Sequence, residues 1–596
     1  NVSYGVTADK STYGENHSVW VERNSVHNFS TIGISLAYVN GLGLANNTMT
    51  GRGHFYDVSV YGRRLWYIRD NTMEGGGIRL GYRLPEQGVQ DFRDNTIRGR
   101  EILYLGGKSD LDVPLDTHQV ILWNCSNCTV EGPLAHPYMP SLTILASSNV
   151  SVSDLDLRGE HYDLIANLVT GLTVEDCTFR DYRYALWMED SSGVVVRGCQ
   201  FVDCSSGILP DNLRNTTVER CRFTGCGYAI GEMFMMYAPG DTTLVANNTF
   251  TDCHHGIYVE RLLTTVIVDN VFANISGRAV FAQYNSHATN GNVTLRGNEM
   301  VNCTTGMELQ GMEDLTIVGN VIEGSAIGIR VFYSEGGTIT WNRVSNCSEF
   351  GIELSSYTTG FVIRANVVEG SYRYGLLIDG TGCRIYLNDF INNSWGYNDS
   401  RQAYDRFGNQ WDHQRLGNYW SDYQEWYPEA TNDGTVWSDP YDVSWGGQYF
   451  DDFPLVHPFD LEPPVADAGG NRTVDEGTRV TLDATGSRDN RGIVRYEWTF
   501  VYDGMARKLN GPTVGFDFVV PGEYRVDLLV IDAVGNEGRD HMWLTVRDVR
   551  PPVVEAGPEV VAEQFTVLTL DGSGCSDTGG IANYTWTLDW VDGPLV

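Results

Sequence analysis

The sequence contains almost no lysine and no long hydrophobic run. Lysine occurs only as Lys10, Lys108 and Lys508, and 76 acidic residues against 41 basic ones give a net charge of −35. A surface this acidic offers no basic patch, so we expect no nucleic-acid partner. No apolar stretch reaches the ~18 residues that a membrane-spanning helix needs, so no membrane span is predicted.

The sequence also lacks an initiator methionine and a signal peptide, and we expect a processed or cropped chain. What it has instead is a high density of N-x-S/T sequons, seventeen in all. This density on an acidic, processed chain predicts an extracellular, cell-surface glycoprotein. The candidate glycosylation sites are Asn16, Asn28, Asn46, Asn124, Asn149, Asn215, Asn274, Asn292, Asn398, Asn471 and Asn583.

A repeat organises residues 173–390. Ten short β-branched runs are each followed by Cys or Asn, any residue, and a large apolar residue, at spacings of 22 to 28. No helical periodicity lies between the runs, so the repeat predicts an all-β fold, a right-handed parallel β-helix solenoid. The Cys/Asn column consists of Cys177, Cys199, Cys221, Asn248, Asn270, Asn298, Asn320, Asn342, Asn366 and Asn388.

Stacked rungs place like residues over like residues, so an inward Asn column can pass amide hydrogen bonds from rung to rung. We therefore expect Asn320 and Asn342 to point into the solenoid and to carry no sugar. Asn24, Asn47, Asn71 and Asn95 continue the pattern toward the N-terminus, and Pro133 and Leu155 carry it to Cys177, which predicts sixteen rungs. The long steps, at 106–116, 231–241 and 283–291, are interpreted as outward loops.

Twelve cysteines in an exported protein usually indicate disulfides, but most of these occupy ladder columns, where a cysteine behaves as a small buried hydrophobe. We expect mostly free thiols, with a few bridges between rungs as the alternative. Cys125 and Cys128 have zinc-like spacing without a second pair, and His254 and His255 point to opposite sides of a strand, so no metal site is predicted.

The stretch GNYWSDY, with a later DPY and FPL, resembles the tail of proteins with NosD-type right-handed β-helix repeats, over about residues 20–460. The resemblance implies copper handling, or carbohydrate binding and sugar hydrolysis. The family's glycine- and aspartate-rich run reads ATNDGTVWSD here, so no cofactor is predicted and calcium stays a weak alternative. Five tryptophans are expected to cap the last rung, namely Trp395, Trp411, Trp420, Trp426 and Trp437.

Pro463 and Pro464 open a different unit of short alternating strands, which predicts a β-sandwich. It resembles a PKD domain, with YEWTF where that family has a YxWDFGDG-like run. The expected domains are a β-helix over 1–395, its cap over 396–460, a PKD-like sandwich over 461–548 and a partial second one over 549–596. The open first rung of the β-helix near Asn1 and the half sandwich that ends at Val596 would leave strand edges unpaired. We therefore expect either that the chain is part of a longer protein or that neighbouring subunits pair with these edges in a filament.

Carboxylates recur about four residues after the small residue of each rung, and the weak catalytic candidates are Glu189, Asp211, Glu260 and Asp379. Neighbouring rungs would bring two of them about 5 Å apart, as a retaining glycosidase needs, but Asp and Ser are also ordinary turn residues. No His or Arg occupies the equivalent position of the repeat in a neighbouring rung, where it could complete an acid–base set. Whether the chain is an enzyme is left open, leaning toward a non-catalytic protein.

Three functions remain. The first is a structural or adhesive surface glycoprotein, such as an S-layer, sheath or filament subunit of an archaeal cell. It would associate with itself or with other cell-surface proteins and glycans. The second is a secreted polysaccharide-active enzyme, a lyase, hydrolase or epimerase, with PKD modules as accessories. The third is a non-catalytic carbohydrate- or metal-binding module.

Overall fold

The computed structural model describes residues 2–9, 18–39, 41–51, 56–62, 65–81, 88–115, 117–132, 141–159, 162–231, 242–260, 264–283, 292–394, 401–444, 446–459, 463–489, 492–532, 536–562 and 566–587. The chain forms two compact units, Asn1–Phe459 and Asp460–Val596.

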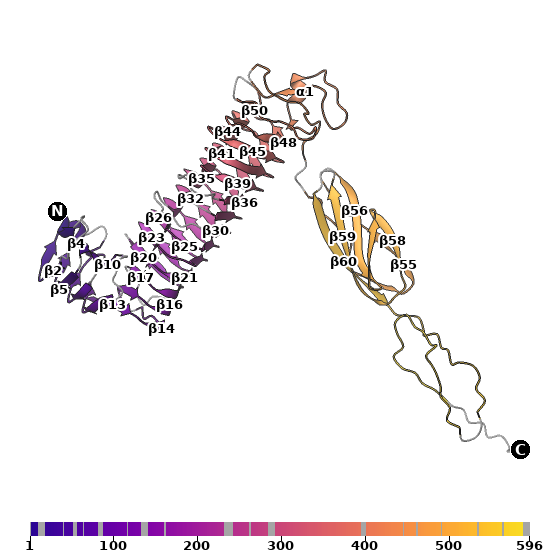
Figure 1. Cartoon of the computed structure of the whole chain (residues 1–596), viewed down its shortest axis with the longest axis horizontal. Helices are drawn as coiled ribbons and strands as arrows, with labels where there is room; N and C mark the ends of the chain where they lie inside the picture. The colour runs from indigo at the N-terminus through magenta and orange to yellow at the C-terminus, as the bar shows by residue number, and fades with distance from the viewer. Residues whose placement is uncertain are drawn as a thin grey trace. The chain divides into compact units, whose positions relative to one another are not determined.

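The first unit is a right-handed β-solenoid of about 15 turns, one fewer than the spacing predicts. Its main part has three parallel sheets, with one strand per sheet in most turns (Figure 1). Sheet 1 consists of β13 (Arg100–Gly106), β15 (Gln119–Trp123), β17 (Ser141–Leu145), β20 (Tyr162–Asn167), β23 (Tyr184–Glu189), β26 (Ser206–Asp211), β29 (Tyr228–Gly231), β32 (His255–Glu260), β35 (Arg278–Gln283), β38 (Thr305–Gln310), β41 (Ile327–Phe332), β44 (Phe350–Leu354), β47 (Tyr374–Ile378) and β50 (Ala403–Asp405).

Sheet 2 follows sheet 1 within each turn, and sheet 3 follows sheet 2. Sheet 2 consists of β14 (Ser109–Asp112), β16 (Ser126–Glu131), β18 (Ser148–Ser153), β21 (Thr170–Glu175), β24 (Val195–Arg197), β27 (Thr216–Glu219), β30 (Thr242–Ala246), β33 (Thr264–Val268), β36 (Asn292–Arg296), β39 (Glu313–Val318), β42 (Glu335–Thr340), β45 (Thr359–Arg364) and β48 (Arg384–Tyr386). Sheet 3 consists of β19 (Asp156–Arg158), β22 (Thr178–Arg180), β25 (Gln200–Val202), β28 (Arg222–Thr224), β31 (Thr249–Thr251), β34 (Val271–Ala273), β37 (Glu299–Val301), β40 (Val321–Glu323), β43 (Arg343–Ser345), β46 (Val367–Glu369), β49 (Asp389–Ile391) and β51 (Tyr419–Trp420).

The first hundred residues form a separate solenoid segment with three short parallel sheets of its own. These are β1 (Val2–Asp9), β4 (Phe29–Val39), β7 (Val58–Gly62) and β10 (Ile78–Leu80); β2 (Ser18–Glu22), β5 (Gly41–Ala45), β8 (Leu65–Arg69) and β11 (Val89–Arg93); and β3 (Ser25–His27), β6 (Thr48–Thr50), β9 (Thr72–Met73) and β12 (Thr96–Ile97). We call residues 2–97 the N-terminal segment.

The N-terminal segment does not continue directly into the main solenoid. β12 pairs antiparallel with β13 across Arg98 and Gly99, which both have positive φ (49° and 79°) and so turn the chain back. Ile121 and Trp123 of sheet 1 then face outward into the core of the N-terminal segment, which packs against this face (Figure 1). The sequence prediction of one continuous ladder is therefore wrong between Asn95 and Leu155.

Two further predictions concern the long steps of the repeat. Residues 109–112 form β14, which pairs with β16, so the loop predicted over 106–116 is wrong in part: its centre is a strand of sheet 2. The other two predicted loops, like Pro133, fall almost wholly outside the described residues.

The buried columns of the main solenoid match the prediction. Phe179, Phe201, Phe223, Phe250 and Phe272 stack with ring centroids 4.5–4.9 Å apart. The amides of the ladder asparagines run beside them at the corner between sheets 2 and 3. Asn320 donates from Nδ2 to Asn342 Oδ1 (2.9 Å) and accepts on Oδ1 from Asn298 N (2.9 Å). The inward orientation of Asn320 and Asn342 is confirmed.

The C-terminal end of the main solenoid is covered by residues 401–459, which include α1 (Tyr423–Trp426), β52 (Tyr441–Asp442) and β53 (Phe450–Asp451). Trp420 stacks on Phe390 at 4.6 Å and on Tyr441 at 4.1 Å, so aromatic rings extend the Phe column beyond the last rung. Trp411 is also buried, whereas Trp426 is half exposed and Trp395 lies outside the described residues. In the described part of the chain, no helix is long and apolar enough to cross a membrane.

The second unit contains a β-sandwich of two sheets. One sheet consists of β54 (Arg472–Asp475), β60 (Glu537–Arg547), β59 (Gly522–Asp532), β56 (Ile493–Tyr502) and β57 (Met505–Asn510), and the other of β55 (Thr478–Asp483) and β58 (Thr513–Phe518). Trp498 of the YEWTF stretch is fully buried between them. Within 549–562 and 566–587 the structure has one isolated bridge, Val553 to Ser576, and most side chains are exposed.

Candidate functional site

The outer face of sheet 1 brings the predicted carboxylates into one column. In β23 the side chains of Leu186 and Met188 are buried, so Trp187 and Glu189, which alternate with them, lie on the outer face. Parallel pairing puts Glu189 in register with Asn167 on one side and Asp211 on the other. The arrangement of Glu189 and Asp211 on neighbouring strands therefore matches the column that the sequence predicts.

The surroundings of Glu189 change its acidity. Its Oε2 accepts a hydrogen bond from Asn167 Nδ2 (2.9 Å), and the adjacent Asp190 accepts one from Asn212 Nδ2 (2.5 Å). Burial raises the pKa of Glu189, and the charges of Asp211 and Asp190 raise it further. Two carboxyl groups on neighbouring strands, one of them with a raised pKa, are an arrangement that acid–base chemistry on a glycosidic bond uses.

An arginine that the sequence did not connect with this column approaches it. Arg79 of β10 lies over the ring of Trp187 at 4.5 Å, and its charge lowers the pKa of Glu189 against the effect of burial. Arg79 is not part of the repeat column, so the prediction that no His or Arg joins the column at the matching position of the repeat does not cover it. Arg79 reaches Glu189 from the N-terminal segment, and no repeat spacing indicates that contact.

The other two carboxylate candidates do not join this pair. The backbone of Glu260 lies in the same column, in register with Gln283. Asp379 accepts from Arg406 Nη1 (3.1 Å) and lies eight strands beyond Glu189, about 38 Å along the solenoid at the usual strand spacing. One substrate bond cannot contact both ends of the column.

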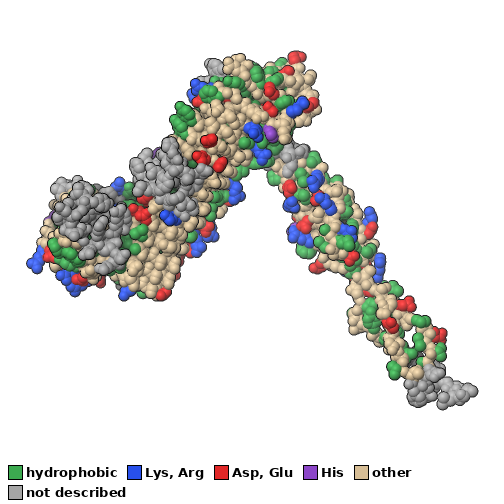
Figure 2. Space-filling model, viewed as in Figure 1, with side chains coloured by type: hydrophobic (Ala, Val, Ile, Leu, Met, Phe, Trp, Pro, Cys, Tyr) green, Lys and Arg blue, Asp and Glu red, His purple; other side chains and the backbone are tan. Residues whose placement is uncertain are grey.

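A network of ion pairs around two buried carboxylates occupies the same face farther along. Glu308, with its side chain 8% exposed, lies 2.9 Å from Arg278 Nε, and Arg330 Nε lies 2.7 Å from Glu353 Oε2. Such charges are costly to bury unless each has a partner, as here. Figure 2 shows basic and acidic side chains interspersed over the face in view, so this surface of the solenoid carries both signs of charge.

No copper-ligand set gathers around the cysteines in the described part of the chain, and the pKa values of their thiols are shifted in both directions. All twelve are free, and eleven are buried. The thiol of Cys177 donates to Glu175 O (3.2 Å), and its hydrogen bond with the Cys199 thiol and its burial raise its pKa, which keeps it protonated. Copper binds thiolates and neutral imidazoles. Among the described residues, no three His, Cys, Asp or Glu side chains gather where they could hold a metal ion.

The two adjacent histidines differ in environment. His254 is exposed and its Nδ1 lies 2.9 Å from Ser276 Oγ, while burial lowers the pKa of His255 to about 4. In ATNDGTVWSD, Asp433 Oδ1 accepts from the backbone of Thr435 and Val436 (both 2.8 Å), so this carboxylate closes a turn.

Every sequon asparagine that the structure describes is exposed, which is fourteen of the seventeen. Asn16 and Asn398 of the candidate sites lie outside the described residues. Five sequons that sequence reasoning did not select are as exposed as the chosen ones: Asn127, Asn247, Asn302, Asn346 and Asn392. The buried ladder asparagines are not the first residue of any sequon.

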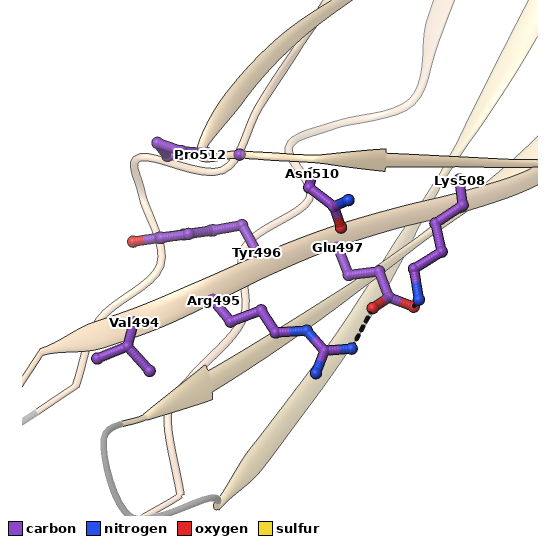
Figure 3. Close-up of a pocket in the computed structure, with 8 residues that line it drawn as sticks. Val494, Arg495, Tyr496, Glu497, Lys508, Asn510 and Pro512 are labelled. Carbon is purple, nitrogen blue, oxygen red and sulfur yellow. Dashed lines mark hydrogen bonds and ion pairs between the residues drawn. The ribbon is translucent and has the colours of Figure 1, made fainter.

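The sandwich has a surface pocket of about 540 Å³ on the β56–β57 hairpin. Glu497 lies between Arg495 Nη2 (2.5 Å) and Lys508 Nζ (2.6 Å), as Figure 3 shows, and the bond to Arg495 lowers its pKa. Tyr496 and Pro512 line the same pocket. The two cations share one carboxylate, which leaves the pocket one net positive charge.

Three family models match the chain. Residues 275–425 match "Periplasmic copper-binding protein (NosD)", residues 86–235 and 140–289 match "Right handed beta helix region", and residues 461–546 match "PKD domain". Two curated relatives are the human dyslexia-associated protein KIAA0319, 33% identical over 141 residues, and its mouse homologue, 32% identical over 141 residues. Each match covers 22% of this chain and 13% of the relative, so the chain spans about an eighth of their length.

Among solved structures, the chain is similar to a periplasmic alginate epimerase, at 13% identity and a TM-score of 0.29, covering 57% of this chain and 76% of that one. Another is the exopolygalacturonase of Thermotoga maritima, at 12% identity and a TM-score of 0.26, covering 59% and 80%. Columns, cap and sandwich agree with the family models: the chain carries a right-handed parallel β-helix, matched by the NosD model over residues 275–425, followed by a PKD domain.

Proposed function

We propose that this chain belongs to an extracellular, cell-surface glycoprotein with a structural or adhesive role. The observation that carries the proposal is the separation of its asparagines into two classes. All fourteen described sequon asparagines are exposed, whereas the ladder asparagines are buried and never begin a sequon. A bulky glycan fits only the first class, so the fold tolerates glycosylation at every described sequon.

The shape of each unit supports the same role. Each turn of the solenoid packs only against its neighbouring turns, so the solenoid presents long faces to partners. The small sandwich presents a surface with charges of both signs. We propose that the partners are other copies of this chain or other surface proteins and glycans, as in an S-layer, sheath or filament. We also propose the division into β-helix (1–395), cap (396–460), PKD-like sandwich (461–548) and partial second sandwich (549–596).

The experiment is surface labelling in the native host. Antibodies to the sandwich should stain intact cells, and the protein recovered from them should react with a glycan stain. Staining that appears only after the cells are permeabilised would contradict the surface location. Recovery of an unglycosylated protein would contradict the glycoprotein assignment.

A second function, action on a polysaccharide, is favoured by one observation: Glu189 with a raised pKa beside Asp211 and near Arg79. If the pair acts on a glycosidic bond, Glu189→Gln should abolish release of new reducing ends from extracellular polysaccharides of the host. Asp379→Asn, in the same column but about 38 Å away, is the matched control and should retain the activity. Equal activity of both variants would exclude this pair.

A further inference from the structure

One column of the solenoid collects residues in the left-handed backbone conformation. It lies at the corner between sheet 3 and sheet 1, one residue per turn, with φ between 50° and 67°. Its members are Asp181, Asp203, Gly225, Asp252, Asn274, Asn302, Gly324, Asn346, Gly370 and Asn392. Only Gly, Asn and Asp adopt this conformation routinely, so the fold itself explains why these three residue types occupy the column.

The second feature of this column is the type of residue that stands two positions after each of its members. After the four asparagines of the column stand Ser276, Thr304, Ser348 and Ser394, so each asparagine heads a sequon. After the six Asp and Gly members, a hydroxyl occurs once, as Ser205. Three of the four hydroxyls also make hydrogen bonds: Thr304 Oγ1 donates to Ser276 O (2.9 Å), Ser276 Oγ lies 2.9 Å from His254 Nδ1, and Ser394 Oγ donates to Arg373 O. The hydroxyls therefore follow asparagine, which indicates a requirement for sequons.

The spacing along the column also favours modification. Asn302, Asn346 and Asn392 occupy alternate turns, and the turns between them carry Gly324 and Gly370. A Cβ on Gly324 would lie 2.7 Å from Asn302 Oδ1, and one on Gly370 would lie 2.9 Å from Asn346 Oδ1. The glycines thus leave room for the asparagine side chains. Attachment points on alternate turns are about 9.6 Å apart, twice the strand spacing.

Asn274 differs from these three. It lies one turn before Asn302, and its Nδ2 donates to Asp252 Oδ1 (3.1 Å). We propose that Asn302, Asn346 and Asn392 carry N-linked glycans that form one stripe along the sheet 3–sheet 1 corner, a proposal that rests on the glycoprotein function above. The stripe covers this edge, so contacts with partners fall on the other faces of the solenoid.

The test is glycopeptide mass spectrometry on the full chain from its native host. We expect sugar on all three asparagines. Asn302→Asp, Asn346→Asp and Asn392→Asp preserve the corner geometry and should each remove one glycan from the intact mass. Ser348→Ala should remove the glycan from Asn346, while Ser205→Ala, at the equivalent position after Asp203, should leave the glycan mass unchanged.

Each result decides between the proposals. Sugar on other sequons, with fewer than all three of these occupied, overturns the stripe and leaves the glycoprotein function standing. A chain without sugar at any sequon overturns both. A loss of glycan mass with Ser205→Ala would show that the hydroxyl acts other than through a sequon, which also overturns the stripe.

Discussion

At the scale of the residue, the asparagine ladder is a chain of bonds in which each amide depends on the next. Asn320 is fully buried, and its Nδ2 also donates to Leu295 O (3.0 Å). Asn320→Leu would remove the side-chain bonds to Asn298, Asn342 and Leu295 and leave the buried Asn298 N without its acceptor, at about 1–3 kcal/mol for each unmet group. We expect a loss of several kcal/mol in unfolding free energy, measured by denaturant titration. Glu299→Leu, exposed beside the ladder, is the control, and equal stability of both variants would contradict the inward ladder.

The ladder ends on a carboxylate that sequence reasoning did not find. Asn418 donates from its backbone N to Asp451 Oδ2 (2.7 Å), and Trp420 Nε1 donates to the same oxygen (2.9 Å). The ladder motif, an asparagine followed by any residue and a large apolar one, occurs once more at Asn418 and Trp420, 30 residues after Asn388. The sequence therefore did indicate this last member of the ladder. Asp451 has no such signal, because it arrives from beyond the repeat.

A second prediction at this scale concerns pH. Asp57 is fully buried, and burial raises its pKa to about 6, although its Oδ2 accepts from Gly75 N (2.8 Å). An unfolded Asp has a pKa near 3.9, so between about pH 4 and pH 6 the folded state binds more protons than the unfolded state. Stability from this group must then fall as pH rises through that window, by about 3 kcal/mol.

The measurement is unfolding free energy at pH 4, 5 and 6 for the wild type and for Asp57→Asn. We expect the difference between the two proteins to change by a few kcal/mol across the window. Asp94→Asn, at an exposed corner, should follow the wild type. A constant difference for Asp57→Asn would mean that Asp57 is not the group responsible.

At the scale of the element, the repeat in the sequence predicts the strands and columns that recur in every turn. It does not predict the point at which the chain reverses direction while the spacing of the repeat is kept. The Cys, Asn and Phe columns could be predicted because each turn places like residues together. The hairpin at Arg98 and Gly99 could not, because Asn95 keeps the spacing of the ladder while the chain reverses. The meeting of Arg79 with Glu189 depends on that reversal, so it was unpredictable for the same reason.

The side-by-side packing of the N-terminal segment gives a prediction about Ile121. Ile121 is fully buried on the outer face of sheet 1, within the core of the N-terminal segment. Ile121→Ala should cost about 2–5 kcal/mol, because it leaves a cavity between the two parts. Hydrogen exchange should show faster exchange in β5 and β8 and unchanged protection in β41. Equal loss in β41 would contradict a separately packed segment.

The aromatic cap gives a second prediction at this scale. Trp420 is buried between Phe390 and Tyr441, so Trp420→Ala should cost about 3–5 kcal/mol and expose the last turn. Trp426→Ala, half exposed in the same cap, should change stability by less than about 0.5 kcal/mol. Thermal unfolding of both variants measures the difference, and a smaller loss for Trp420→Ala than for Trp426→Ala would contradict the capping role.

At the scale of the whole molecule, the buried columns fix the solenoid and leave its corners free to vary. Corners in the left-handed conformation accept Asn without strain, which lets sequons accumulate on the outside while the ladder stays closed to sugar. A net charge of −35 adds long-range repulsion between copies, so we expect any assembly of this chain to tighten when cations screen that charge.

The most direct test of the surface-glycoprotein account is protease shaving of intact native cells, followed by glycopeptide mapping of the released fragments. The account predicts that fragments of this chain are released without lysis and carry sugar on exposed sequons such as Asn149, Asn302 and Asn346. It would be contradicted if fragments appeared only after lysis and the sequon peptides were bare.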